Sequence, residues 1–154
     1  MRTFERTYLY PLDVVVGPDV IIITCPDIPE MVACGGDDLA ASVHAADDVL
    51  VSVLSGYVEG GRAIPVPSPA VGRPIARLPT QMVAKLLLHD VMLIDGVSDQ
   101  RLAALLGVDR DTVRHLRAPM HSSTVGAIGE AFRAIGLRLV IAAHSVAATE
   151  DTAD

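Results

Sequence analysis

The sequence predicts an α+β protein with a β-rich N-terminal part and a helical C-terminal part. Up to residue 34, β-branched and aliphatic runs alternate with Gly and Pro turn signals, whereas from residue 79 apolar residues recur every three or four positions. Between them lies a connector with five prolines, AIPVPSPAVGRPIARLP at 63–79. We therefore expect domains at 1–78 and 79–145, followed by a disordered acidic tail at 146–154.

Three strands and one long helix are expected in the first domain. The strands are predicted at 8–16, 20–25 and 31–34, with a loop at 26–29, because two prolines within four residues interrupt a strand ladder. Asp37 or Asp38 can cap the helix that follows. Its expected inward face carries apolar residues at helical spacing, namely Leu39, Val43, Ala46, Leu50, Val53 and Tyr57. Residues 75–78 are expected to add a last edge strand, which gives the order β-β-β-α-β.

The second domain is expected to be helical and to end in a strand. One helix is predicted from about residue 80 to Gly96 and another from about residue 125 to Gly136, because Gly readily ends a helix. Residues 137–143, LRLVIAA, predict a C-terminal strand. Two copies of the chain could pair these strands antiparallel, or the strand could pair only within its own chain. The candidate dimer interface consists of Leu137, Leu139 and Ile141.

The stretch SDQRLAALLGVDRDTVRHLR at 98–117 predicts two short helices joined by a tight turn. Ser98 and Asp109 can cap the two helices, and Gly107 can end the first one. With Val113 and Leu116 facing inward, the pattern is typical of a helix-turn-helix, whose second helix enters the DNA major groove. The alternative is a helical hairpin with solvated arginines. The candidate DNA-binding residues are Gln100, Arg110, Thr112, Arg114, His115 and Arg117.

The charge is unevenly distributed along the chain. The net charge is −7, with five Arg against ten acids in residues 1–79 but seven Lys or Arg against six acids in residues 80–145. The C-terminal half can therefore approach phosphates, whereas the N-terminal half repels nucleic acid and attracts a basic partner. We expect a soluble, cytoplasmic protein, because no apolar run reaches the ~18 residues of a membrane helix and no secretory signal opens the chain.

The cysteines and histidines of the sequence form no metal or cofactor motif. Cys25 and Cys34 have neither a metal-ligand nor a redox spacing, so buried, reduced thiols are expected. His44 and His89 are isolated from other ligand-type residues in the sequence. We therefore predict no metal site, no cofactor and no catalytic residues.

Several segments, in their order along the chain, resemble the HicB antitoxin family of HicA–HicB toxin–antitoxin pairs. They are YPLDVVV, the Pro-Asp-Ile-Pro loop at 26–29, Gly36-Asp37-Asp38, IPVPS at 64–68, LPTQMVAKLLLHDVM, the stretch at 98–117, and HSSTVGAIGEAFRAIGLRL. The resemblance implies a partial ribonuclease-H-like first domain without nuclease activity. That domain would bind and block a small basic mRNA-cleaving HicA-type toxin. The helix-turn-helix would bind operator DNA of its own operon as part of a homodimer or homotetramer.

Two other functions are compatible with parts of the sequence. A DNA-binding regulator without a toxin would use the first domain to sense a small molecule. A metal-dependent nuclease would need several carboxylates converging on the strands, but Asp13 is the only acid inside an expected strand. The sequence therefore favours an antitoxin that also represses its own operon, and not an enzyme.

Overall fold

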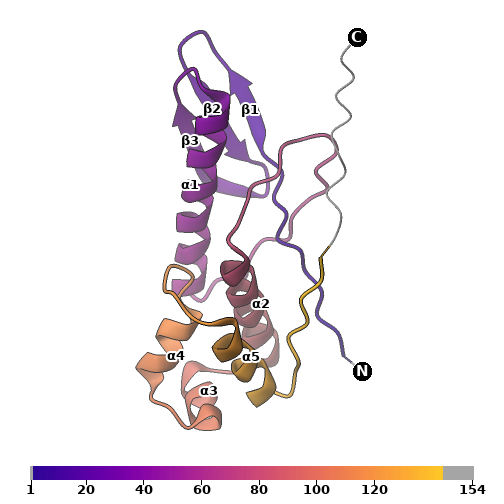
Figure 1. Ribbon diagram of the computed structural model, residues 1–154, viewed down its shortest axis with the longest axis vertical. Coiled ribbons are helices and arrows are strands. Elements are labelled where there is room, and N and C mark those ends of the chain that lie inside the picture. The colour runs from indigo at the N-terminus through magenta and orange to yellow at the C-terminus, as the bar shows by residue number, and fades with distance from the viewer. Residues whose placement is uncertain (1, 144–154) are drawn as a thin grey trace.

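The computed structural model describes residues 2–143 of the chain. The sheet and the long helix α1 form one end of the molecule, three short helices form the other, and α2 lies between them (Figure 1). The expected tail at 146–154 lies outside the described residues. The elements are β1 (Asp13–Val16), β2 (Ile21–Cys25), β3 (Ile28–Gly35), α1 (Leu39–Glu59), α2 (Thr80–Asp95), α3 (Asp99–Leu106), α4 (Arg110–Arg117) and α5 (Val125–Ala134).

The three strands form an antiparallel sheet in the order β1-β2-β3, and α1 covers one face of it. Alternate residues of β2, such as Ile21 and Ile23, are buried, whereas Ile22 between them is exposed. β3 follows the same rule, with Met31 buried and Val32 exposed. This two-residue period follows from the pleat of a strand, and it confirms the expected α+β architecture.

The strands differ from the prediction at two places. Only the segment from Asp13 onward pairs as β1, and β3 already begins at Ile28. The loop expected at 26–29 therefore shrinks to a two-residue turn. Pro29 is tolerated because the pairing register shifts next to it, between the partners of Thr24 and Cys25, so no ladder hydrogen bond requires its missing N–H.

Two further expected strands are absent from the part of the chain that the structure describes. At 75–78 there is a single bridge, Pro11 with Ile75, because the flanking prolines at 74 and 79 lack the N–H that a ladder needs. Residues 137–143 form no strand, since no neighbouring strand of the same chain pairs with them. The fold is therefore β-β-β-α followed by four helices. The edge strand expected at 75–78 is wrong, and the pairing of residues 137–143 with a second copy stays a prediction.

α1 begins at the cap residue Asp38, whose carboxylate accepts a hydrogen bond of 3.2 Å from the Ala41 amide. The prediction of the inward face of α1 is confirmed at the centre of the helix and is wrong at its first residue. Leu50 and Ala46 are fully buried, but Leu39 is 48% exposed. The buried row runs instead at steps of four, through Ser42, Ala46, Leu50, Leu54 and Val58. Length and composition alone would also allow α1 to cross a membrane, but this row packs on the sheet.

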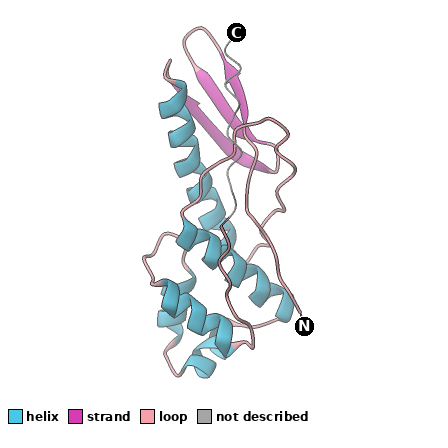
Figure 2. Cartoon of the chain, turned by 45° about the vertical axis from the view of Figure 1, so that its right-hand side comes forward, coloured by secondary structure: helices cyan, strands magenta, loops and turns pink. Residues whose placement is uncertain are grey.

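α2 belongs to both hydrophobic clusters of the molecule. Its residues Met82 and Leu86 join the cluster formed by the sheet and α1. One turn later, Leu88 and Val91 join the cluster formed by α3, α4 and α5. Figure 2 shows α2 in this bridging position. The domain boundary expected between residues 78 and 79 therefore lies immediately before a helix that both ends of the molecule share.

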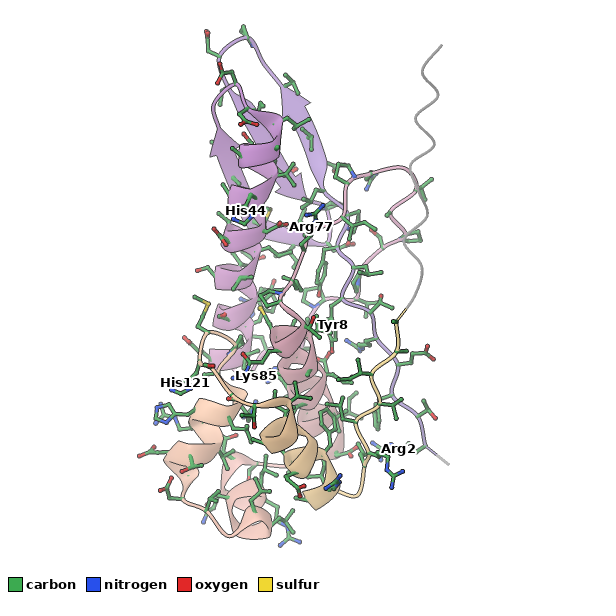
Figure 3. The ribbon with its side chains drawn as sticks, in the orientation of Figure 1. Arg2, Tyr8, His44, Arg77, Lys85 and His121 are labelled. Carbon is green, nitrogen blue, oxygen red and sulfur yellow. The ribbon has the colours of Figure 1, made fainter. Side chains whose placement is uncertain are left out.

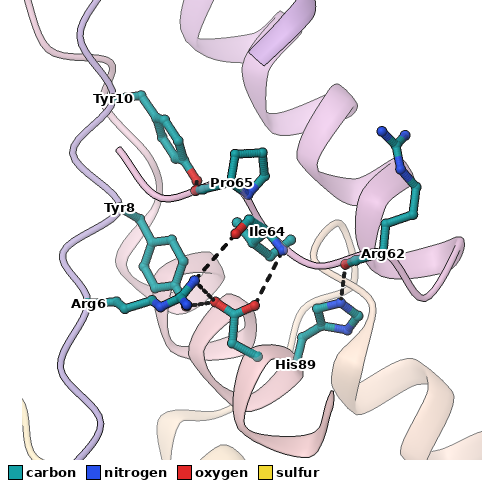
Figure 4. Close-up of polar contacts among 8 residues, drawn as sticks. Arg6, Tyr8, Tyr10, Arg62, Ile64, Pro65 and His89 are labelled. Atoms are coloured by element: carbon teal, nitrogen blue, oxygen red, sulfur yellow. Dashed lines mark hydrogen bonds and ion pairs between the residues drawn. The ribbon is translucent and has the colours of Figure 1, made fainter. Parts of the chain in front are cut away.

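A buried carboxylate on α2 fastens the N-terminal segment and the connector to this helix (Figure 4). Asp90 accepts hydrogen bonds from the Tyr8 hydroxyl at 2.6 Å and the Arg6 guanidinium at 2.9 Å. It also accepts one from the backbone amide of Ile64 at 3.4 Å. Burial, reinforced by the adjacent Asp90 carboxylate, raises the pKa of Tyr8 far above its ordinary range, so this hydroxyl remains a donor at every accessible pH.

Tyr8→Phe and Tyr10→Phe form a matched pair, because each removes one buried hydroxyl. Tyr8 donates to a carboxylate and Tyr10 donates to the neutral carbonyl of Pro65, both at 2.6 Å. We expect Tyr8→Phe to lower the free energy of unfolding by about 2 kcal/mol and Tyr10→Phe by about 1 kcal/mol. Urea unfolding monitored by circular dichroism measures both. Equal losses of unfolding free energy in the two variants would mean that the hydrogen bond to Asp90 stabilises the fold no more than one to a neutral carbonyl.

Gly35→Ala is expected to destabilise the packing of β3 on α1. A Cβ at Gly35 would clash with the Ser42 hydroxyl and lie 2.6 Å from the Ser42 Cβ, which no rotation of that side chain relieves. The expected loss is about 1–3 kcal/mol in urea unfolding. Gly36→Ala is the control, since nothing lies within 4 Å of its Cβ. The packing argument is wrong if both variants unfold at the same urea concentration.

Candidate nucleic-acid interface

The candidate interface is built on α3 and α4, which meet at the turn around Gly107. Ser98 caps α3 by accepting from the Arg101 amide at 3.1 Å, and Asp109 caps α4 by accepting from the Thr112 amide at 2.6 Å. Hydrogen bonding from Thr112 lowers the pKa of Asp109, which keeps this cap charged. Gly107 ends α3 with a φ of 69°, a conformation that favours glycine. These three local predictions are confirmed.

The inward side of this helix pair is anchored in the second hydrophobic cluster. Leu102 and Val113 are fully buried, and Ala103 is 6% exposed. They pack with Val91 of α2 and Phe132 of α5, and the half-buried Leu116 lies against the same cluster. Val113 and Leu116 thus face inward as predicted, and the orientation of α4 is determined by packing on α2 and α5.

The outward side of α4 carries most of the predicted contact residues. Arg110, Thr112, Arg114 and His115 are all exposed, as is Gln100 on α3. Arg114 pairs with Asp111 at 3.5 Å, but both side chains are more than half exposed, so the pair contributes little and leaves the guanidinium available. Arg101, which is not among the predicted contact residues, is also exposed on α3, one position after Gln100. The structure thus brings five of the six predicted residues to the surface of one helix pair.

Arg117 is the sixth residue, and it does not fit the predicted role. Its side chain is only 16% exposed and forms an ion pair with Asp99 at the start of α3. It also donates to the Nδ1 atom of His89 at 2.6 Å. The reason is helical spacing: Arg117 lies four positions after the buried Val113 and so shares its inward face. We therefore exclude Arg117 from the proposed contact surface.

Lys85 of α2 holds the end of α4 in place. Its side chain is fully buried, and the ammonium donates to the backbone carbonyl oxygens of Ala118, at 2.8 Å, and of His121. Burial lowers the pKa of Lys85, because no carboxylate among its hydrogen-bond partners offsets the loss of hydration. Figure 3 shows Lys85 and His121 near the junction of α2 with the helical end. Nothing in the sequence distinguished this lysine from a solvated one.

Two histidines extend the exposed surface of α4. The rings of His115 and His121 stack with their centroids 4.7 Å apart. Arg114 and His115 also line a cavity of about 550 Å³ between α4 and the last turn of α1. Its lining mixes both signs of charge and consists of Val58, Glu59, Asp99, Asp111, Arg114, His115, Arg117 and Ala118. Acidic side chains therefore lie beside Arg114 and His115 in this cavity.

The candidate dimer residues lie on the C-terminal segment. Leu137 and Leu139 are half-buried and pack against the second cluster, close to Phe4 of the N-terminal segment. Ile141 is 62% exposed. Two of the three residues are thus already in contact with their own chain, and their pairing with a second copy stays a prediction.

The acids of the N-terminal half have two different environments. Asp47, Asp27, Asp13 and Glu30 bind groups of the same chain: the Arg77 amide at 2.8 Å, Ser68 at 2.9 Å, Arg73 at 3.3 Å and Arg62 at 3.0 Å, respectively. By contrast, Asp48 and Glu59 are exposed on α1. Within residues 2–143, no three His, Cys, Asp or Glu residues converge as a metal site would require.

Comparison with known proteins identifies the family. Residues 10–87 match the family model described as the HicB-like antitoxin of bacterial toxin–antitoxin systems. The chain is 35% identical to Antitoxin HicB 2 of Photorhabdus laumondii, over 77% of this chain and 84% of that protein. It is 33% identical to Antitoxin HicB of Pseudomonas fluorescens, over 88% and 94% of the two chains. Antitoxin HicB of Escherichia coli is 27% identical over 84% of this chain and 95% of that protein.

These matches are to antitoxins over most of the length of both partners, and the family model spans the sheet, α1 and the first half of α2. They agree with the expectation that the chain is not an enzyme, because an antitoxin acts by binding. The chain therefore belongs to the HicB-like antitoxin family of bacterial toxin–antitoxin systems.

Proposed function

We propose that the chain neutralises a HicA-type toxin with its N-terminal half and represses its own operon by binding operator DNA through α4. The observation that supports the DNA-binding part is the division of α4 into two faces. Val113 is fully buried, whereas Arg110, Arg114 and His115 on the same helix are exposed. A helix anchored on one side with arginines on the other suits entry into a major groove, with α3 and α4 acting as a helix-turn-helix.

The proposed DNA contacts divide by side-chain chemistry. Arg110 and Arg114 can bind phosphate or the O6 and N7 atoms of guanine, because a guanidinium forms paired hydrogen bonds. Thr112 and His115 complete the surface of α4, and Gln100 would hold the DNA backbone from α3. Repression in this form requires a homodimer or homotetramer, since half-sites lie about 34 Å apart on the duplex. Leu137, Leu139 and Ile141 remain the proposed seam.

The proposed toxin-binding surface is the exposed side of α1 together with the sheet edge. His44, Asp48 and Ser52 are exposed at steps of four along α1, and Glu59 is exposed at its end. Val15 and Val16 on the edge strand β1 are 64% and 67% exposed. Acidic groups would accelerate encounter with a basic toxin, and the apolar edge would hold the complex. We include in this proposal the partial ribonuclease-H-like character of the first domain, which serves binding and not cleavage.

Small-molecule sensing is less well supported. The cavities of about 550 and 420 Å³ lie against α4 and against the C-terminal segment, respectively, and neither lies within the core of the sheet and α1. The toxin and DNA proposal accounts for both ends of the molecule without a further ligand.

Arg114→Ala tests the DNA-binding part. We expect it to weaken binding to duplex DNA from the promoter of the operon by about tenfold and to reduce the salt dependence of binding. Fluorescence anisotropy at several salt concentrations measures both quantities. Arg133→Ala is the control, because Arg133 on α5 is equally exposed and likewise pairs with an acid three residues away. Equal binding by the two variants would exclude α4 as the contact helix.

Asp48→Lys tests the toxin-binding part. We expect it to slow association of the full-length chain with the small basic protein encoded by the adjacent reading frame, mainly at low salt, because steering depends on charge. Stopped-flow or interferometry experiments measure the association rate. Asp19→Lys, which makes the same charge change in the exposed turn after β1, should have a smaller effect. If both variants associate as fast as the wild-type chain, α1 does not face the toxin.

A further inference from the structure

A series of polar contacts connects the end of α1 to α4 through one buried histidine of α2. His89 is fully buried, and its Nε2 atom lies 2.7 Å from the carbonyl oxygen of Arg62 (Figure 4). Its Nδ1 atom lies 2.6 Å from an amino nitrogen of Arg117, which in turn pairs with Asp99. These contacts join four segments in series: the turn after α1 that contains Arg62, the helix α2, the last turn of α4 and the first turn of α3.

The two partners determine the protonation state of His89. A carbonyl oxygen can only accept, so Nε2 must carry a proton and donate it to Arg62. A guanidinium can only donate, so Nδ1 must be unprotonated and accept from Arg117. Both contacts are satisfied by one species alone, the neutral ring with its proton on Nε2. A second proton on Nδ1 would remove the acceptor and place two cations against each other.

We infer that His89 is a positioning residue for α4, and that its neutral ring links Arg62 to Arg117 so that acidification weakens the binding of DNA by α4. The inference rests on the DNA-binding function proposed above, and it identifies a residue outside α3 and α4 on which that function depends. Arg117 lies in the last turn of α4, one residue before Ala118, whose carbonyl Lys85 binds. Lys85 and His89 are one turn apart on α2, so the same face of α2 binds the end of α4 at two places, Ala118 and Arg117.

The surroundings of His89 favour the neutral ring. Burial is the main cause that lowers the pKa of His89 below its ordinary value. The hydrogen bond to the Arg62 carbonyl raises it in part, and the charge of Arg117 on α4 lowers it further. Asp90 on α2 and Asp99 on α3 act in the opposite direction but with smaller effect. Since the folded-state pKa of His89 lies below that of the unfolded chain, the contribution of the neutral ring to the free energy of unfolding is fully present above about pH 6.5 and is lost as the pH falls through the folded-state pKa.

Two substitutions separate the contacts of the ring. His89→Asn keeps an acceptor near the position of Nδ1, and His89→Gln keeps a donor near the position of Nε2. Full-length wild-type and variant proteins would be titrated with duplex promoter DNA by fluorescence anisotropy at pH 7.5 and at a series of lower pH values. At pH 7.5 we expect His89→Gln to lose about tenfold in affinity and His89→Asn clearly less.

The pH profile distinguishes positioning from a merely structural role. His115 and His121 are exposed and present in all three proteins, so their contribution to DNA binding is common to all three. The readout is therefore the affinity ratio of wild type to His89→Asn. This ratio is expected to fall as the pH is lowered from 7.5 through the folded-state pKa of His89, because only the wild-type chain loses its Arg117 acceptor on acidification. Thermal melts at each pH establish that each variant is folded.

Long-range ¹⁵N–¹H spectra of the imidazoles test the inference without DNA and without a variant. The DNA-free wild-type chain at neutral pH should show His89 with its proton on Nε2. A proton on Nδ1, or an affinity ratio independent of pH, would overturn the inference.

Arg114→Ala in the same series of titrations distinguishes the failure of this inference from the failure of the proposed function. If Arg114→Ala weakens DNA binding while both His89 variants bind DNA like wild type, the positioning role of His89 is wrong and the proposal of DNA binding by α4 is retained. If Arg114→Ala also has no effect, DNA binding by α4 fails.

Discussion

The structure depends on one buried anion, the carboxylate of Asp90, which ties the N-terminal segment and the connector to α2. A buried charge is costly unless hydrogen bonds replace its hydration, and here Arg6, Tyr8 and the amide of Ile64 replace it. None of these groups lies in a regular element, so their position depends on this carboxylate. The N-terminal segment, which leads into the sheet, and the connector, which leaves α1, are thereby joined to α2 by directional contacts and not by apolar packing alone.

The remaining polar residues of α2 extend this arrangement toward α4. Lys85 and His89 are buried, and both bind groups at the end of α4. Hydrogen bonds in a dry environment have strict geometry and few alternatives, so they specify one orientation of the helix where aliphatic packing would tolerate several. In an antitoxin of this family, that orientation connects the half proposed to hold the toxin with the helix proposed to hold DNA.

Charge alone gives an incomplete account of the acidic N-terminal half. Asp47 and Asp27 accept hydrogen bonds from the connector, and Glu30 pairs with Arg62, so these acids stabilise the extended chain on the sheet and α1. Such a proline-rich connector has few N–H groups for a ladder, and carboxylates supply acceptors where no strand is available. The acidic surface available to a partner is therefore smaller than the composition indicates, and two of its exposed acids, Asp48 and Glu59, lie on α1.

Local features of this protein were determined by the sequence alone: the α+β class, the caps at Ser98 and Asp109, the turn at Gly107 and the buried side of α4. Each depends on residues within a few positions of one another, for which helical period and capping chemistry suffice. Tertiary structure decided what depends on distant partners. It left residues 137–143 without a neighbouring strand, turned Arg117 inward toward Asp99, and buried Lys85 and His89 between the two clusters. The physical reason is that the environment of a long polar side chain is set by whichever groups the fold brings beside it.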